Sequence, residues 1–374
     1  MIKVRVQDLK PGMVVGYPLL RDDGVVLLRE GVTLTSRLIL RIKEAGFEYI
    51  YVRDHRFRDV DLEETISHDV RRQALLTLND SFTSIVKGKQ TSLEPIRKLV
   101  DEIIDEVLSS KRSVASLVQL RQHDDAVFSH SVNVAALSVF LGKFLGLSRQ
   151  QLRMLALGSL MHDLGKVKVP LEILNKPGKL LPGEWEVMRN HPLWSVELIT
   201  GKAPEEVVSI TVALQHHERL DGSGYPYGLL ENDIHFLSRI CACSDVYDAL
   251  TVDRPYRQRF SYAEALEYLM GNAGKLFDLQ VVTAMVRHIA PYPVGETVRL
   301  TTGEIGVVVK LNEGLPIRPV VRVIRDQNGN LLEKPRDVDL LRELTVAIAG
   351  SEVNGYEEYR QPIPQEAGRK MSDD

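Results

Sequence analysis

Five histidines and two aspartates in the middle of the chain have the residue types and the spacing of a metal site. Imidazole nitrogens and carboxylate oxygens hold Zn, Mn or Fe while leaving coordination positions open for water. Neighbouring members of the set lie up to roughly thirty residues apart, a spacing that suits inward-pointing side chains on successive helices of a bundle. The set is His130, His162, Asp163, His191, His216, His217 and Asp245.

The adjacent pair His162 and Asp163 carries much of this interpretation. It follows residues 156–161, which are wholly uncharged, so the pair is expected in an apolar interior. A single histidine on an apolar face is usually a hydrogen-bonded core residue rather than a ligand. Burying an unpartnered His–Asp pair, however, would cost on the order of several kcal/mol, and a metal ion is its natural neutraliser.

Lys166 follows Asp163 by three residues and would lie on a similar face if the helix continued. A lone lysine is normally a solvated surface charge. One helical turn from a presumed metal ligand, it becomes a candidate contact for a phosphate oxygen of a substrate. We expect Gly165, which has no side chain, to let such a ligand come close.

Helical periodicity dominates the segment that carries these residues, and strand-like alternation flanks it. A helix expected at 36–45 and a strand at 49–52 belong to a small N-terminal α+β module, with turns at 10–12 and 22–24. The strands expected near the C-terminus span 297–300, 306–311 and 319–325, with a turn at 326–329. The fold class is therefore mainly α, and the expected parts are the α+β module (1–55), a helical linker (56–120), an all-helical central domain (121–290), a β-rich appendage (291–345) and a disordered tail (346–374).

A helix expected within 92–112 has one apolar stripe at helical spacing, with charged residues on its other faces. Two interpretations stay open. The stripe packs on its own domain, or it forms the seam of a homodimer. Its members are Ile96, Leu99, Val100, Ile103, Ile104, Val107 and Leu108.

Composition excludes several classes of protein. The 374 residues are 44% hydrophobic and 26% charged, which is typical of globular domains rather than disordered chains. The formal net charge of −4 argues against binding to long nucleic acids. We expect neither a signal peptide nor a membrane span. Cys241 and Cys243 lie too close in sequence for an ordinary disulfide and indicate a reducing, cytoplasmic compartment.

Several segments together resemble one enzyme family. His162 and Asp163, with His130 upstream and Asp245 downstream, resemble the HD phosphohydrolase superfamily. The segment HHERLDGSGYP at 216–226 closely matches the extended signature of its HD-GYP subfamily. The match continues in the correct order through 176–178, Met188, 191–192 and 245–257.

This resemblance implies a cyclic di-GMP phosphodiesterase with an all-helical catalytic domain, which converts cyclic di-GMP to linear pGpG and then to GMP. It also implies two divalent metal ions, Fe or Mn, with Zn, Ni or Mg as alternatives. Coordination would lower the pKa of water from ~15.7 to about 7 and so favour attack on the phosphodiester. One ion would be held by His130, His162, Asp163 and Asp245, and the second by His191, His216 and His217, with Asp163 shared.

The same resemblance assigns the substrate contacts. Asp163 and Lys166 are the expected catalytic residues. The guanidinium groups of Arg254 and Arg257 could bind phosphate or the edge of guanine, and the ring of Tyr225 could pack against a base. The alternative for the Gly-Tyr-Pro turn is that it only shapes the loop. The expected substrate-binding residues are Lys166, Tyr225, Arg254 and Arg257.

A few positions depart from the family pattern or have no direct role. Some members hold a third metal through a glutamate one turn before the first histidine, but Ala126 stands at that position, so we expect two ions. Ser195 and Val252 replace the glycine and serine common in the family, and both are minor departures that leave the resemblance intact. Asp221 and Asp248 are expected to orient other groups or to cap turns.

Other functions remain as alternatives. The motifs specify phosphodiester chemistry better than base identity, so another cyclic dinucleotide, such as a cyclic GMP–AMP hybrid, is a second substrate hypothesis. A non-catalytic receptor that binds cyclic di-GMP and acts through signalling partner proteins is a third. Because degenerate members typically lose His-Asp or His-His and this chain keeps both pairs, the sequence favours the enzyme.

Overall fold

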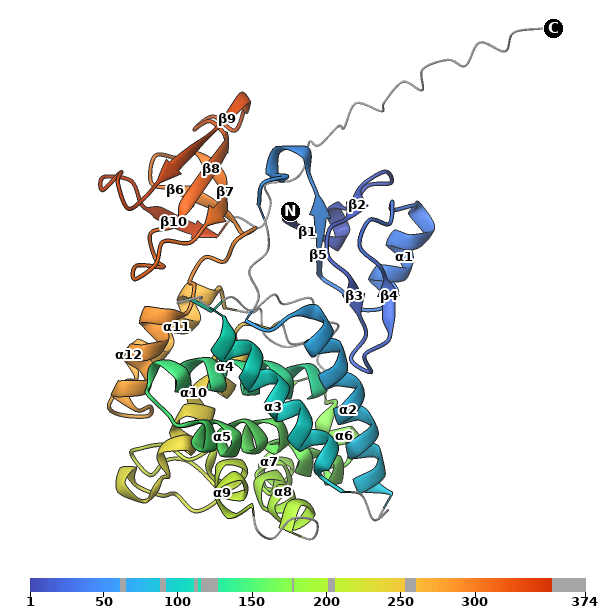
Figure 1. Cartoon of the computed structure of the whole chain (residues 1–374), viewed down its shortest axis with the longest axis vertical. Coiled ribbons are helices and arrows are strands. Elements are labelled where there is room, and N and C mark those ends of the chain that lie inside the picture. The colour runs from blue at the N-terminus through green and yellow to red at the C-terminus, as the bar shows by residue number, and fades with distance from the viewer. Residues whose placement is uncertain are drawn as a thin grey trace, which may run out of the picture.

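The computed structural model describes residues 1–60, 65–87, 92–110, 114–115, 127–176, 178–200, 206–252 and 260–351. A bundle of helices forms the lower part of the molecule in Figure 1, and a small N-terminal module and a C-terminal sheet lie above it. The expected mainly helical fold, with a β-containing module at each end of the chain, is confirmed.

The helical domain is built around one continuous apolar core. Every described residue from Ser131 to Gly142 is buried, so the helix that contains them is covered on all sides and forms the centre of the bundle. The longer helices are α2 (His68–Val86), α3 (Glu94–Ser109), α4 (Val127–Phe144), α5 (Arg149–Met161), α8 (His191–Thr200), α9 (Val207–Gln215), α10 (Phe236–Leu250), α11 (Tyr262–Gly271) and α12 (Leu279–His288). Short helices connect them: η3 (Leu164–Lys168), α6 (Leu171–Leu174), α7 (Pro182–Met188) and η4 (Glu231–Asp233).

The apolar stripe of α3 packs inside the chain itself. Ile96, Ile103 and Ile104 are fully buried, and α3 contacts α2, α4 and α5. The first interpretation of the stripe is therefore confirmed for six of its seven members, while Leu108 is 39% exposed and a homodimer through this helix stays a prediction. The expected linker at 56–120 is wrong in part, because α2 and α3 share the core of the helical domain.

The N-terminal module confirms the expected helix and strand. A three-stranded antiparallel sheet has the order β1 (Ile2–Arg5), β5 (Tyr49–Arg53), β2 (Val14–Val15). Beside it are the helix α1 (Ser36–Glu44), which the Thr35 side chain caps, and a hairpin of β3 (Leu19–Leu20) and β4 (Val26–Leu28). Gly46 closes the helix with a φ of +77°, a conformation that glycine adopts most readily.

The C-terminal sheet has five antiparallel strands in the order β10-β6-β7-β8-β9. The expected strands and the turn at 326–329 are present. One expectation is corrected: residues from 346 were expected in a disordered tail, but β10 pairs with β6. The bounds are β6 (Thr297–Leu300), β7 (Ile305–Lys310), β8 (Val320–Arg325), β9 (Leu331–Asp339) and β10 (Ile348–Ser351).

The two ends of the chain share a second apolar core, separate from the helical one. Phe57 and Val60, which follow β5, are buried in it together with residues of the C-terminal sheet. Arg322 in β8 donates to the backbone oxygen of Arg56 at 2.8 Å and to the carboxylate of Asp59 at 2.7 and 2.8 Å. The N-terminal module and the C-terminal sheet are therefore one packed unit.

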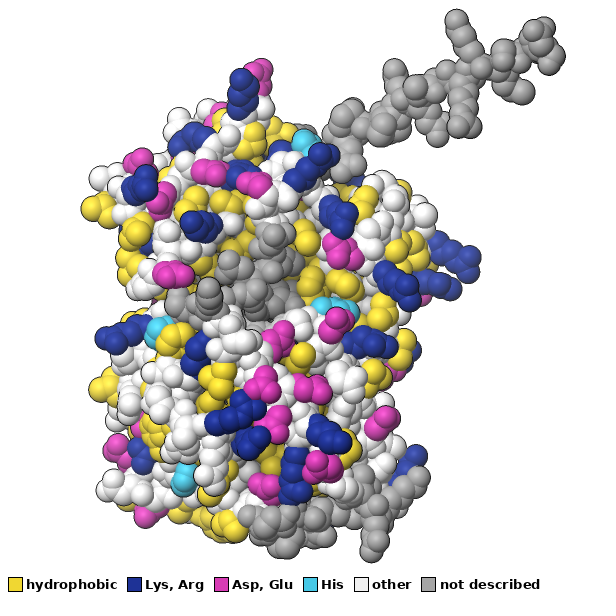
Figure 2. Space-filling model, in the orientation of Figure 1, with side chains coloured by type: hydrophobic (Ala, Val, Ile, Leu, Met, Phe, Trp, Pro, Cys, Tyr) yellow, Lys and Arg dark blue, Asp and Glu magenta, His cyan; other side chains and the backbone are white. Residues whose placement is uncertain are grey.

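The visible surface carries no large area of one charge. Figure 2 shows Lys and Arg side chains interspersed with Asp and Glu over the helical half of this face. Arg149 and Arg153 on α5 pair with Asp101 and Asp105 on α3, for example. Within the described residues, no helix combines the length and the apolar character needed to cross a membrane.

Candidate metal centre

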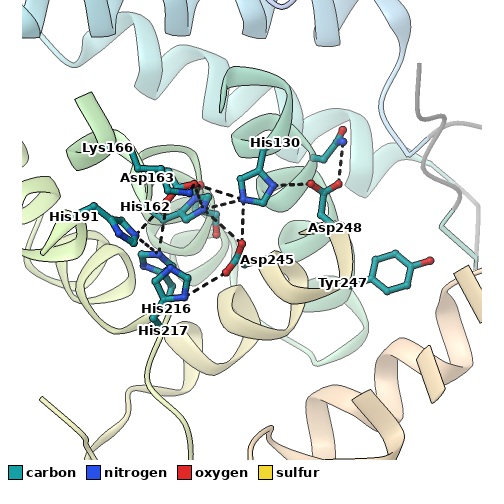
Figure 3. Close-up of polar contacts among 12 residues, drawn as sticks. His130, His162, Asp163, Lys166, His191, His216, His217, Asp245, Tyr247 and Asp248 are labelled. Atoms are coloured by element: carbon teal, nitrogen blue, oxygen red, sulfur yellow. Dashed lines mark hydrogen bonds and ion pairs between the residues drawn. The ribbon is translucent and has the colours of Figure 1, made fainter. Parts of the chain in front are cut away.

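The seven candidate ligands converge in the middle of the helical domain (Figure 3). Each comes from a helix or from the residues directly after one, as the sequence predicts. They are His130 in α4, His162 after α5, Asp163 before η3, His191 at the start of α8, His216 and His217 after α9, and Asp245 in α10.

The ligand atoms form two neighbouring groups. One contains Asp163, His191, His216 and His217, and the other contains His130, His162 and Asp245. Within each group, the candidate ligand atoms all lie within 4.8 Å of one another. This division matches the two ligand sets that the resemblance implies.

The carboxylate of Asp163 lies between the two groups. Its Oδ2 is 3.3 Å from Nε2 of His162 and 3.7 Å from Nε2 of His130. Its Oδ1 is 3.3 Å from Nε2 of His191 and 3.9 Å from Nε2 of His216. One oxygen therefore faces each group, which is the geometry that a shared ligand needs.

Three of the histidines are held by the same local contact. The Nδ1 atoms of His162, His191 and His216 lie 2.7 to 2.8 Å from the backbone oxygen three residues earlier. A carbonyl can only accept, so each Nδ1 carries the proton and each Nε2 keeps a lone pair that points into the centre. Such contacts fix the tautomer and the ring orientation of histidines that bind metals.

These donors fit divalent cations. Nε2 of His130 lies 3.3 Å from Nε2 of His162, and Nε2 of His191 lies 3.2 Å from Nε2 of His216. Lone pairs that face each other repel unless a cation or a proton lies between them. Oδ1 of Asp163 is also buried and accepts no hydrogen bond from a described residue. A cation in each group would therefore stabilise nitrogens that otherwise need a proton between them, and it would also give Oδ1 of Asp163 a partner.

Burial and charge set the protonation of these groups. Burial lowers the pKa of His191 to about 4 and holds the pKa values of His216 and His217 well below their usual range, so their nitrogens are free to bind a metal. Burial would also lower the pKa of His130, but hydrogen bonds to Asp245 and Asp248 raise it to about 9. This part of the centre therefore favours positive charge.

Asp248 orients His130 through Nδ1, the ring nitrogen that faces away from the other candidate ligands, as expected. Its Oδ2 lies 2.6 Å from Nδ1 of His130, and its Oδ1 accepts a hydrogen bond from Asn133 at 3.0 Å. Asn133 in turn accepts from Arg71 of α2 at 2.5 Å. Sequence reasoning missed Asn133 and Arg71. The one available signal was that Asn133 lies three residues after His130, on a similar face of the helix.

The sequence correctly singled out Gly165, but for the wrong reason. A Cβ at Gly165 would lie 2.0 Å from the backbone oxygen of His191, so the missing side chain admits α8 rather than a ligand. Ser195 of α8 donates to the backbone oxygen of His162 at 2.8 Å and accepts from the Gly165 amide at 2.7 Å. Its hydroxyl thus ties α8 to the turn that bears two candidate ligands.

Lys166 lies at the edge of the centre, with a quarter of its side chain exposed, and its Nζ is 2.6 Å from Oδ2 of Asp163. Burial would raise the pKa of Asp163, but His162 and Lys166 hold it well below its usual range. The lysine is therefore close enough to the candidate ligands to meet a group bound there.

Known proteins share sequence similarity with most of this chain. A family model described as "HD domain" matches residues 113–281. A cyclic di-GMP phosphodiesterase of Pseudomonas aeruginosa is 37% identical over 285 residues, which are 76% of this chain and 69% of the relative. The cyclic di-GMP phosphodiesterase response regulator RpfG of Xanthomonas campestris is 36% identical over 57% of this chain and 56% of its own length. This chain belongs to the HD-GYP family.

Two further comparisons extend this result. A 3'3'-cGAMP-specific phosphodiesterase of Vibrio cholerae is 38% identical over 50% of this chain and 43% of its own length. A second family model, described as "KOW domain associated with HD domain", matches residues 297–355, which include the five-stranded sheet. The β-rich appendage of this HD-GYP protein is therefore similar to the KOW domains that accompany HD domains.

The HD-GYP segment after His217 folds back over the metal centre. The ring of Tyr225 stacks on His217 with centroids 4.5 Å apart, and the guanidinium of Arg189 lies 5.2 Å from the Tyr225 ring centroid. Buried Glu218 accepts from the amides of Tyr227 and Leu229 at 2.8 and 2.9 Å, which holds the loop in place. Tyr225 thus supports a candidate ligand, and its contact with a base stays a prediction.

Some expected positions have a different status. Asp221 accepts hydrogen bonds from the amide and the hydroxyl of Ser223, so it caps a turn as expected. Arg254, Arg257 and Ala126, which bear on substrate binding and on the third metal, lie outside the described residues.

Proposed function

We propose that this chain is a metal-dependent phosphodiesterase that hydrolyses cyclic di-GMP to linear pGpG and then to GMP. The observation that carries the proposal is the position of Asp163, with one carboxylate oxygen facing each group of histidines. The relatives named as cyclic di-GMP phosphodiesterases support the same substrate. We place the reaction in the helical domain, with α2 and α3 included because they share its core.

The proposed ligands are the two groups described above. One ion would bind His130, His162, Asp163 and Asp245, and the other would bind His191, His216, His217 and Asp163. Divalent ions held there would lower the pKa of water to about 7 and neutralise charge on the phosphoryl oxygens. We propose Fe or Mn, since a histidine-rich site with a shared carboxylate suits both, with Zn, Ni or Mg as alternatives.

The chain's own residues would bind and orient the substrate. The ammonium group of Lys166, held by Asp163, supplies a fixed positive charge for a non-bridging phosphate oxygen. Arg254 and Arg257 are proposed to contact phosphate or guanine on the strength of the family resemblance alone. Tyr225 would contact a base through whatever part of its ring His217 leaves accessible.

A cyclic GMP–AMP hybrid is the second candidate substrate. It shares the phosphodiester chemistry, and the Vibrio cholerae relative is named as specific for it. A non-catalytic receptor is less favoured, because all seven candidate ligands are present and converge. The buried free thiols of Cys241 and Cys243 support a cytoplasmic setting.

The test is product analysis with purified protein under Mn²⁺ or anaerobic Fe²⁺. We expect cyclic di-GMP to be converted to pGpG and GMP faster than 3'3'-cGAMP is cleaved, and both reactions to stop when the metal is chelated. Faster cleavage of 3'3'-cGAMP would favour the second candidate. Tight binding of cyclic di-GMP without product, in protein shown to contain metal, would favour the receptor.

A further inference from the structure

The β3–β4 hairpin of the N-terminal module reaches the start of the helix that bears His130. In the turn between its strands, Oδ1 of Asp22 accepts a hydrogen bond from the amide of Ser129 at 2.9 Å. Its Oδ2 accepts from the amide of Phe128 at 3.4 Å. Both amides belong to the first turn of α4 as the structure describes it, and the amides of a first helical turn are the groups that a capping side chain satisfies.

This contact has the chemistry of a helix cap supplied by a distant part of the chain. A carboxylate at a helix N-terminus satisfies free amides and interacts favourably with the helix dipole. Asp22 and Ser129 are 107 residues apart in sequence. The cap therefore exists only while the N-terminal module stays docked on the helical domain.

Packing fixes the hairpin where it meets the helices. Leu20 belongs to the core of the helical domain rather than to that of its own module, and Val26 packs against the same core. Gly24, with a φ of +78°, lies so close to α2 that a Cβ there would be 2.8 Å from Cγ of Leu76. The position of the Asp22 carboxylate is therefore set from both sides of the turn.

The capped residues directly precede a candidate metal ligand in the chain. Ser129 precedes His130, whose Nε2 is 3.0 Å from Oδ1 of Asp245. His130 thus lies in the first turn of α4, the part of a helix most prone to fraying. Asp248 holds the imidazole ring through Nδ1, but the backbone that carries this ring depends on the contacts of the first turn.

We propose that Asp22 is a positioning residue for His130, and that the N-terminal module thereby sets the metal affinity of the group His130, His162 and Asp245. The proposal rests on the proposed function for its kinetic consequence, but its metal-binding consequence is measurable without any substrate. It gives the N-terminal hairpin a part in the reaction, although the hairpin contributes no candidate ligand.

The experiment compares Asp22→Ala, Asp22→Asn and Asp23→Ala in the full chain. Asp23 is the matched control, because it lies in the same turn but accepts from the amide of Val25 and pairs with Arg21. Mn²⁺ is titrated calorimetrically into metal-free protein, and kcat and KM for cyclic di-GMP and the thermal midpoint are measured in parallel. Asp22→Asn keeps an oxygen acceptor and tests rescue.

We expect Asp22→Ala to weaken one of the two Mn²⁺-binding steps by roughly fivefold, as the loss of a helix cap would. The other step should be unchanged, kcat should fall with little change in KM, and Asp22→Asn should recover most of the loss. Asp23→Ala should match the wild type. Unchanged Mn²⁺ affinity in Asp22→Ala, with or without a lower thermal midpoint, would overturn the proposal. If the wild type binds Mn²⁺ but cleaves no cyclic dinucleotide, the proposed function fails while the affinity comparison still stands.

Discussion

Nδ1 of His130 and Oδ2 of Asp248 lie 2.6 Å apart and join α4 to α10 at the edge of the metal centre (Figure 3). Asp248 is fully buried, and its other oxygen accepts from Asn133. A carboxylate behind a metal-binding histidine fixes the ring and raises its basicity. The contact therefore supports the proposed role of His130 through a residue that is not itself among the candidate ligands.

The first prediction concerns this pair. Replacing Asp248 by Asn keeps the volume but removes the charge, and we expect metal affinity and turnover to fall roughly 10- to 100-fold. Metal titration and steady-state kinetics check this result. Asn133→Ala should have a smaller effect, since Asp248 keeps its bond to His130. Wild-type metal affinity in Asp248→Asn would show that His130 does not need this partner.

The second prediction concerns the close approach of η3 and α8. In Gly165→Ala, the new Cβ would lie 2.0 Å from the His191 oxygen and 2.6 Å from the Ser195 amide. Backbone must move to admit it, so we expect stability to fall by about 1–3 kcal/mol and metal content to drop.

Gly183→Ala is the matched control, because a Cβ there meets no described atom within 4 Å. Urea unfolding measures the stability of both variants, and metal analysis measures their metal content; we expect only Gly165→Ala to fall below the wild type. If the two variants behave alike, the tight packing at Gly165 has no energetic consequence.

The third prediction concerns the unit formed by the two ends of the chain. The hydrogen bond from Arg322 lowers the pKa of Asp59 to about 2, against an unfolded value of about 3.9. A lowered carboxylate pKa contributes stability that is present above pH ~4 and is lost as the pH falls towards 2. Because the Asp59 side chain is 64% exposed, we expect no more than about 1 kcal/mol.

Asp59→Asn should therefore be less stable than the wild type at pH 7, and the difference should shrink between pH 4 and pH 2. Denaturant unfolding followed over this pH range measures both effects. A difference that stays constant with pH would mean that the charge of Asp59 contributes nothing.

The fourth prediction comes from the sequence alone. Arg254 follows Asp245 by nine residues, and the resemblance assigns it to substrate binding. Loss of a charge-assisted hydrogen bond worth about 1.5–3 kcal/mol should raise KM for cyclic di-GMP roughly tenfold or more in Arg254→Ala. Metal content and the hydrolysis of bis(p-nitrophenyl) phosphate should stay nearly as before. Equal loss on both substrates would point to a structural role instead.

The candidate ligands could be predicted from the sequence because their residue types and their positions in or beside helices both indicate a metal site. His162 and Asp163 follow the buried, uncharged end of α5, and imidazole and carboxylate groups together are typical metal ligands. The fold class followed from the same periodicity. The N-terminal helix expected at 36–45 was also placed correctly, since α1 spans Ser36–Glu44.

The remaining features depend on contacts between distant residues. Asp248 and His130 are 118 residues apart, and only the fold shows that they meet. The role of Gly165 was misread because its spacing cannot tell whether a ligand or a helix fills the space beside it. The shared core of the two terminal modules could not be predicted either, because no local sequence pattern shows that the two modules pack against each other.

The central claim is that one carboxylate, Asp163, serves two metal ions, and metal counting tests it most directly. We predict two ions per chain in the wild type reconstituted with Mn²⁺ or anaerobic Fe²⁺ and analysed by mass spectrometry of the metals. Asp163→Ala should lose occupancy at both groups together and should not hydrolyse cyclic di-GMP. A wild type with one ion, or with three tightly bound ions, would contradict the two-ion account. An Asp163→Ala variant that keeps two ions and full turnover would remove Asp163 from the centre.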